Sequence, residues 1–158
     1  MDEAQLQLLR EASGLRLDKE GRFFHRGGLI EHERTLSVLH RGIHRAADGR
    51  WATRIGSEWG YLDVEDAALF VQNVAQDGAL LRGEMLTGEW EEIAALASGA
   101  DDALYARVRG ERARLTRAAQ ASLLPWLHEQ SGHYWLQLGS KRMPIGKDAG
   151  PEPRRTAP

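Results

Sequence analysis

Short turn signals divide this chain into segments too brief for anything but small hairpins and short helices. Glycine stands at four of these turns: Asp18–Gly21, Gly56-Ser57, Gln76–Gly78 and Gly139-Ser140. Alternating or aromatic-rich residues flank each turn, as in "WATRI" and "WGYLDV" around Gly56-Ser57. The sequence therefore predicts four β-hairpins, and the longer apolar-periodic segments between them predict helices in a mixed α+β fold.

The N-terminal segment 2–13 begins with acidic residues and ends at Ser13-Gly14, which predicts a helix with Leu6, Leu9 and Leu8 on its buried side. A strand is expected at 104–109. Pro125 should kink the last predicted helix or split off its final turn. The four predicted helices cover residues 2–13, 31–47, 87–98 and 111–130.

An offset of 83 residues superimposes Arg26-Gly27 on Arg109-Gly110 and Gly56-Ser57 on Gly139-Ser140. Arg34 then falls on Arg117. We interpret this as two strand-helix-strand-strand repeats packed about a pseudo-twofold axis, although glycine at turns recurs in any α+β protein. The predicted parts are an N-terminal helix and first strand (1–17), a first repeat (18–75), a connecting strand and helix (76–102), a second repeat (103–146) and a disordered tail (147–158).

The composition excludes several classes of protein. The 158 residues contain no cysteine, which removes disulfide scaffolds, thiolate nucleophiles and cysteine-ligated zinc. A formal charge of −2 gives no global reason to bind nucleic acid. No uncharged run approaches the ~20 apolar residues of a spanning helix, and the N-terminus is acidic rather than basic. We expect a soluble, cytoplasmic protein without a membrane partner.

Arginines dominate the segment "ARVRGERARLTR". Arg109-Gly110 is expected to close a strand directly before a helix, where free backbone N–H groups favour a phosphate or carboxylate. If the repeats face each other, the arginines of both converge and Glu65 with Asp66 supplies counter-charge, whereas the alternative is solvated or ion-paired surface arginines. The predicted ligand-binding residues are Arg26, Arg34, Arg109, Arg117, His25, Glu65 and Asp66.

Catalytic and metal signatures are weak. Glu65 and Asp66 are adjacent, so in a strand they point to opposite faces, and a turn or helix-cap role is favoured over an acid–base pair. His40 and His44 have the helical spacing of a metal pair but lack a third ligand, and we predict neither a metal nor another cofactor. The tryptophans are expected mainly in the core, although Trp59 or Trp135 is a candidate for lining a cleft.

Three segments resemble a known family: "DKEGRFFHRGGLI" (18–30), "LDVEDAALF" (62–70) and "LYARVRGERARLTR" (104–117). They are similar to the bacterial proteins of the domain of unknown function 1285 family, over roughly residues 18–145. The resemblance implies a two-part α+β fold with a repeated motif that binds a small ligand or serves in signalling. The family's pattern falls on His25, Glu65, Asp66, Tyr105, Arg109 and Gly110.

The chain departs from the family's pattern near these residues. Ala68 stands where the family usually has proline, and His32 where it has a basic residue. The Arg-Gly segment is also about one residue shorter. These changes put the identity of the ligand in doubt.

Three functions follow from the sequence. The first is a regulatory module that binds a small anionic ligand without catalysis. The second is an interaction adaptor that docks a partner protein through Arg112 and Arg114. The third, ranked last, is a hydrolase that uses His25 with Glu65 or Asp66.

Overall fold

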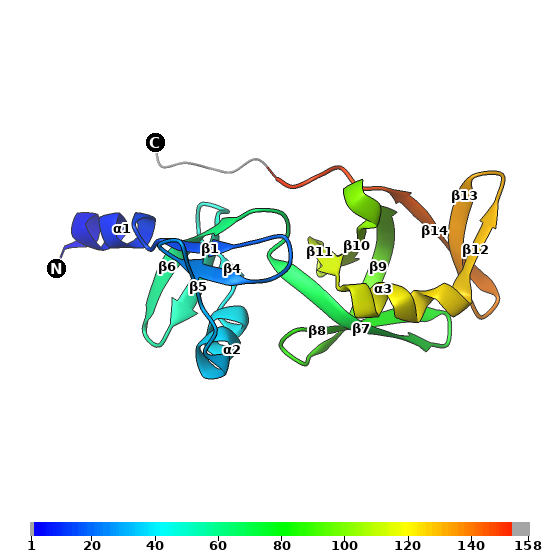
Figure 1. Cartoon of the computed structure of the whole chain (residues 1–158), viewed down its shortest axis with the longest axis horizontal. Helices are drawn as coiled ribbons and strands as arrows, with labels where there is room; N and C mark the ends of the chain where they lie inside the picture. The colour runs from blue at the N-terminus through cyan, green and yellow to red at the C-terminus, as the bar shows by residue number, and fades with distance from the viewer. Residues whose placement is uncertain (1, 153–158) are drawn as a thin grey trace. The chain divides into compact units, whose positions relative to one another are not determined.

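The chain forms two compact units in a computed structural model that describes residues 2–152 (Figure 1). The first unit comprises residues up to Ala68 together with the segment from Pro151, and the second comprises Leu69–Gly150. The predicted mixed α+β class is confirmed. No helix in residues 2–152 is long and apolar enough to cross a membrane.

The first unit is a six-stranded sheet with two helices. Its strand order is β3-β2-β1-β6-β5-β4, antiparallel except for the parallel pair β1–β6. Helix α2 contacts β5, and α1 contacts β6. The elements are α1 (Glu3–Glu11), β1 (Leu15–Leu17), β2 (Phe23–His25), β3 (Gly28–Leu29), α2 (Glu33–Arg41), β4 (His44–Arg45), β5 (Trp51–Ile55) and β6 (Glu58–Val64).

Local signals explain where these helices begin and end. Asp2 and Gln5 form a capping box at the start of α1. Helix α2 ends at Arg41, so the prediction that it continues to residue 47 is wrong. The reason is Gly42, where an added Cβ would lie 2.6 Å from the carbonyl oxygen of Arg54, so the chain turns here against β5.

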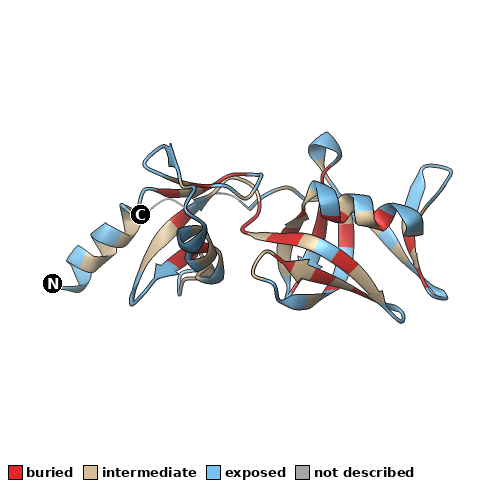
Figure 2. Cartoon of the chain, turned by 60° about the horizontal axis from the view of Figure 1, so that its bottom comes forward, coloured by how far each residue is buried: buried red, intermediate tan, exposed pale blue. Residues whose placement is uncertain are grey.

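The core of the first unit lies between α2 and the sheet. Phe23, Leu17 and Leu39 are fully buried. The hydroxyl of Thr53, also fully buried, donates a 2.7 Å hydrogen bond to the Leu39 carbonyl. Helix α1 has no buried residue, as its colouring in Figure 2 shows. The expectation that its leucines are buried is therefore wrong.

The second unit contains a five-stranded barrel. Strands β7, β8 and β9 form an antiparallel meander, β9 pairs with β10 and β10 with β11, and the parallel pair β11–β7 closes the ring. Strands β14, β13 and β12 extend the sheet from β9. The elements are β7 (Leu69–Asp77), β8 (Leu80–Met85), β9 (Trp90–Ser98), a 3₁₀ turn (Ala100–Asp102), β10 (Leu104–Val108), β11 (Glu111–Leu115), α3 (Arg117–Leu123), a 3₁₀ turn (Leu124–Trp126), β12 (Leu127–Gln130), β13 (His133–Leu138) and β14 (Lys141–Lys147).

Two predicted helices of this unit are wrong. Residues 90–98 form β9 instead, which pairs with β8, β10 and β14. The strand has a bulge opposite β10, since Arg107 pairs with Ala95 but Val108 pairs with Ile93. The bulge turns Ile93 and Leu96, three residues apart, to the same buried side, which imitates helical spacing. The predicted helix 111–130 is reduced to α3, and Pro125 lies in a separate 3₁₀ turn as expected.

The core of the second unit fills the barrel and continues under α3. Helix α3 packs on β7 through its buried residues Ala119 and Leu123. The same core includes Leu136 and Leu138 of β13. Figure 2 shows buried positions, in red, on the strands of this unit and on α3.

The two units have strands in the same order. The path β11-β10-β9-β14-β13-β12 in the second unit corresponds to β3-β2-β1-β6-β5-β4 in the first, with the same parallel and antiparallel pairs. The turns Arg26-Gly27 and Arg109-Gly110 lie at corresponding places, and all four residues have positive φ. The predicted pseudo-twofold axis concerns the arrangement of the two units and stays a prediction.

The predicted disordered tail is wrong over residues 147–152. The Asp148 carboxylate accepts two hydrogen bonds from Arg112, at 2.8 Å from Nε and 2.7 Å from Nη2. Glu152 accepts two hydrogen bonds from Arg45. These acidic residues neutralise arginines that are largely buried, which keeps the segment in place, whereas 153–158 lie outside the described residues.

Candidate functional site

The arginines predicted to bind an anion are divided between the units. Arg26 lies at the β2–β3 turn with φ of 50°, and its N–H donates to the Gly14 carbonyl. Arg34 is exposed on α2. Arg109 and Arg117 belong to the second unit. Convergence of the four depends on how the units are arranged and stays a prediction.

The helix expected directly after Arg109-Gly110 is absent, because β11 follows the turn. Arg109 instead makes a 3.5 Å ion pair with Glu91. Arg117 is the first residue of α3 and donates to the Asp101 carbonyl at 3.5 Å. The predicted anion site at a helix N-terminus is therefore wrong in its geometry.

Glu65 fulfils the favoured turn role. It lies in the bend after β6 with Asp66, and its N–H donates to the Leu17 carbonyl. Its carboxylate accepts a 3.0 Å hydrogen bond from the Lys19 N–H and lies 3.7 Å from Arg16. These contacts tie the bend to the β1–β2 turn.

His40 and His44 do not form the helical pair considered from the sequence, since α2 ends between them. His40 packs edge-on against Phe23 at 4.7 Å, and burial lowers its pKa. His44 shares a 2.7 Å hydrogen bond with the Gly42 carbonyl. Residues 2–152 contain no cluster of three or more potential metal ligands.

A cavity of about 640 Å³ lies within the first unit. Its walls come from α1, α2 and the sheet, so segments far apart in sequence build it. That volume is typical of small-molecule sites. The lining residues that matter for the argument are Leu6, Leu9, Arg10, His25, Ile55 and Trp59.

The cavity leaves apolar side chains accessible. Leu9 is 58% exposed and Ile55 is 53% exposed, although both line a concave site. Leu15 and Leu39 lie deeper in the same cavity and are buried. Because removing apolar surface from water stabilises at about 25 cal/mol per Å², an apolar ligand would gain free energy here.

Polar groups stand among these apolar residues. Arg10 lies 4.2 Å above the Trp59 ring and 3.3 Å from the carboxylate of Glu3. The Nε of Arg10 is buried and has no hydrogen-bond partner. Such an unsatisfied donor costs about 1–3 kcal/mol. His25 is exposed at the cavity, and its side chain has no hydrogen-bond partner within residues 2–152.

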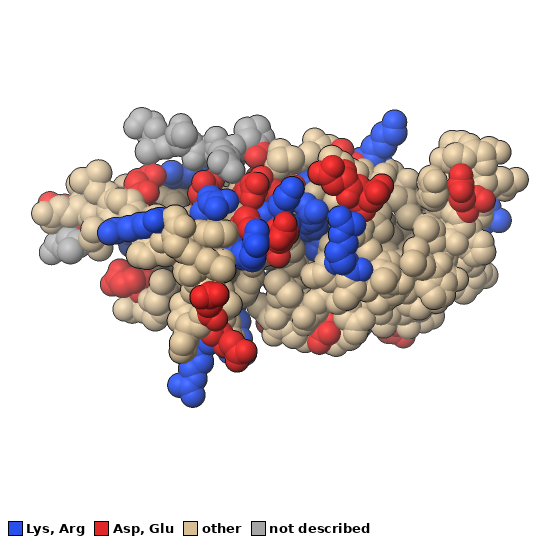
Figure 3. Space-filling view, viewed as in Figure 1, with Lys and Arg blue, Asp and Glu red and all other residues tan. Residues whose placement is uncertain are grey.

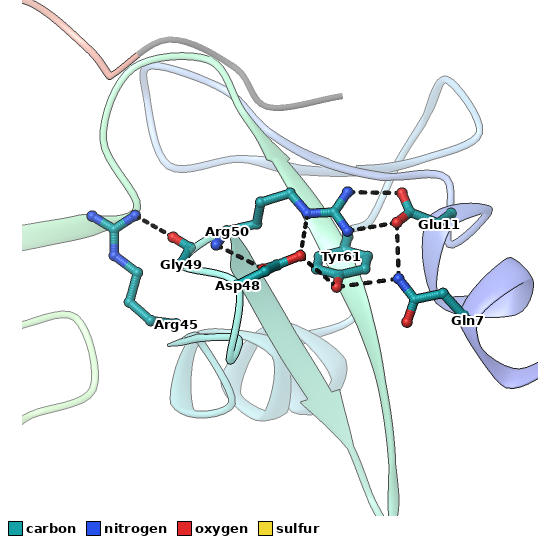
Figure 4. A network of polar contacts seen from close by, with 7 residues as sticks. All are labelled: Gln7, Glu11, Arg45, Asp48, Gly49, Arg50 and Tyr61. Carbon is teal, nitrogen blue, oxygen red and sulfur yellow. Dashed lines mark hydrogen bonds and ion pairs between the residues drawn. The ribbon is translucent and has the colours of Figure 1, made fainter. Parts of the chain in front are cut away.

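A polar network holds α1 in position beside the cavity (Figure 4). Glu11 accepts hydrogen bonds of 2.8 and 2.5 Å from Arg50, which also binds Asp48. The hydrogen bond from Arg50 holds the pKa of Glu11 below its ordinary value. Tyr61 donates to Asp48 and lies under the Arg50 guanidinium. Helix α1 is thus attached by charge rather than by buried apolar contacts.

Surface charge does not single out another anion site on the face shown in Figure 3, where basic and acidic side chains are interleaved. Arg112, one of the two arginines expected to dock a partner, has a side chain only 13% exposed and is paired with Asp148. It also stacks on Tyr105 at 3.8 Å. Arg112 is therefore committed to the fold of its own unit.

Of the seven predicted ligand residues, only His25 lines the cavity. Of the two tryptophans considered for a cleft, Trp59 lines this cavity and Trp135 does not. Arg10 was missed. No signal in the sequence singles it out, since its partner in the cavity wall, Trp59, lies 49 positions later.

The fold and the cavity define a two-unit α+β protein with a small-molecule-sized cavity in its first unit. Two solved structures resemble it. One is a DUF1285 family protein from Silicibacter pomeroyi, with a TM-score of 0.64 and 18% identity over 85% of this chain and 80% of that chain. The other is a DUF1285 family protein from Shewanella baltica, with a TM-score of 0.53 and 18% identity over 73% and 93%.

These likenesses confirm, at the level of the fold, the resemblance drawn from the sequence. No family model matches the chain, and no curated protein matches it.

Proposed function

We propose that this protein is a non-catalytic module that binds a small ligand in the cavity of its first unit. The observation that carries the proposal is the cavity itself, about 640 Å³ and lined largely by apolar side chains, of which Leu9 and Ile55 are more than half exposed. We propose that ligand binding by this module serves regulation or signalling.

The anionic character expected of the ligand is supported by the cationic group in the cavity wall, Arg10, rather than by the predicted arginine set. Catalysis has less support. Glu65 is engaged with Lys19 and Arg16, so it is not poised as a partner for His25 in hydrolysis.

A thermal-shift screen of small acids, nucleotides and apolar metabolites tests the proposal. A ligand present at 100 times its dissociation constant adds about 2.7 kcal/mol of stability. Ile55→Trp, which fills the cavity, should abolish the shift. Leu80→Trp, at a 43% exposed site in the second unit, should leave it intact. The proposal fails if no compound stabilises the protein, or if both variants behave alike.

The two units are, in this proposal, copies of one duplicated motif arranged about a pseudo-twofold axis. The equal strand order and the 83-residue offset of corresponding turns support the duplication. Membership of the domain of unknown function 1285 family is proposed on the same grounds and on the shared fold.

A further inference from the structure

We propose that the ligand of this cavity is an amphipathic carboxylic acid, with its hydrocarbon body among Leu6, Leu9 and Ile55 and its carboxylate on Arg10. This inference rests on the proposed function and names the chemistry of its ligand. It concerns residues of the first unit alone.

The body of the ligand must be apolar because the cavity offers it few polar contacts. Leucine and isoleucine side chains from α1, α2, β1 and β5 line the cavity together with Ile30 and Trp59. Leu9 and Ile55 are each more than half exposed, so an occupant that covers them removes apolar surface from water. Helix α1, which buries nothing of its own, would acquire an apolar contact.

The contacts of the Arg10 guanidinium indicate that the head group of the ligand is a carboxylate. Its guanidinium is fixed against Trp59, with its side chain 18% exposed. Its Nε lacks an acceptor, while Nη1 holds the carboxylate of Glu3 at 3.3 Å. A guanidinium binds a planar carboxylate through parallel hydrogen bonds, so a ligand carboxylate can take the place of Glu3 on Arg10.

Glu3 acts as an exchangeable occupant of this guanidinium. Its side chain is 83% exposed, so its ion pair with Arg10 is screened by water and contributes little. A ligand carboxylate bound from the apolar side of the cavity forms an ion pair that water screens less, and it replaces Glu3. Glu58, which also lines the cavity, disfavours a head group with a second negative charge, so a monocarboxylate fits better than a phosphate dianion.

Isothermal titration with decanoate and 1-decanol, both below their aggregation limits, tests this inference. We expect decanoate to bind the full chain more tightly than the alcohol. Arg10→Gln should weaken decanoate binding at least about tenfold and leave the alcohol unchanged, since a hydrogen bond to a charged group has that magnitude. Arg41→Gln, an exposed arginine on α2 outside the lining, is the matched control and should change neither.

The variant Glu3→Gln distinguishes a role of Arg10 in ligand binding from a merely structural role. Removing the competing carboxylate should strengthen decanoate binding, whereas loss of a structural ion pair would weaken it or leave it unchanged. Circular dichroism confirms that each variant is folded. If the alcohol and the acid bind alike and Arg10→Gln affects neither, the carboxylate assignment is overturned while the cavity remains a binding site. If neither binds and no other compound does, both proposals fail.

Discussion

The attachment of α1 can be tested by removing one negative charge. Glu11→Gln keeps the size of the side chain but replaces the carboxylate that Arg50 holds through two hydrogen bonds. Arg50 is 12% exposed and Glu11 is 23% exposed, so water screens the pair only in part. Helix α1 buries no residue, and the loss should therefore appear as easier opening of this helix.

The magnitude follows from these contacts. A hydrogen bond to a charged group contributes about 1.5–3 kcal/mol. Glutamine retains one oxygen acceptor, and Arg50 keeps Asp48 and Tyr61, so we expect a loss of about 2 kcal/mol. By hydrogen exchange, the amide of Ala12, the C-cap residue of α1, which donates to the Leu8 carbonyl, should exchange roughly 30-fold faster.

The same substitution should change the response to acid. The hydrogen bond from Arg50 lowers the pKa of Glu11 from its ordinary value of 4.5. The ionised Glu11 therefore contributes fully to the stability of the folded state at a pH above 4.5, and this contribution disappears as the pH falls through the lowered pKa. Glu11→Gln should remove this part of the acid sensitivity. Glu3→Gln on the same helix, 83% exposed, should cost no more than about 0.5 kcal/mol. Equal exchange rates in α1 for wild type and Glu11→Gln would refute the reasoning.

Three further changes have outcomes that chemical or thermal unfolding measures. Gly42→Ala should destabilise by about 3 kcal/mol, because its Cβ would lie 2.6 Å from the Arg54 carbonyl oxygen; an unchanged melting temperature would contradict this. Asp148→Asn should cost about 3 kcal/mol because it leaves Arg112 largely buried beside a neutral group, while Glu129→Gln at an exposed site should cost almost nothing. Thr53→Val should cost about 1–3 kcal/mol, since a buried α2 carbonyl loses its donor, and a neutral result would show that water replaces the hydroxyl.

The hairpins were predictable because their turns are encoded locally. Gly21, Gly56, Gly78 and Gly139 all have positive φ in the structure, which glycine adopts without strain. The helix predicted over 87–98 failed because the bulge in β9 is created by pairing with β10, a partner that the segment's own sequence does not reveal. The helix predicted after Gly110 was wrong for a similar reason. This segment, with its alternating arginines, forms a barrel strand only because it pairs with β10 and β7.

The candidate site was predictable only in fragments. His25 and Trp59 were selected as residues for a ligand or a cleft, and both line the cavity. Leu9 was expected in a core because helical spacing does not distinguish a buried face from one that faces an open cavity. Arg10 gave no signal of its own, since its importance comes from Trp59, 49 positions later, and from the missing acceptor at Nε.

The most direct test of the cavity as a binding site is a methyl NMR titration of the full chain, labelled at leucine and isoleucine, with decanoate. The account predicts that the methyl signals of Leu9 and Ile55 shift with a common saturation curve, while those of Leu80 in the second unit stay in place. Signals of Leu9 and Ile55 that do not move, or that move no more than those of Leu80, would contradict it.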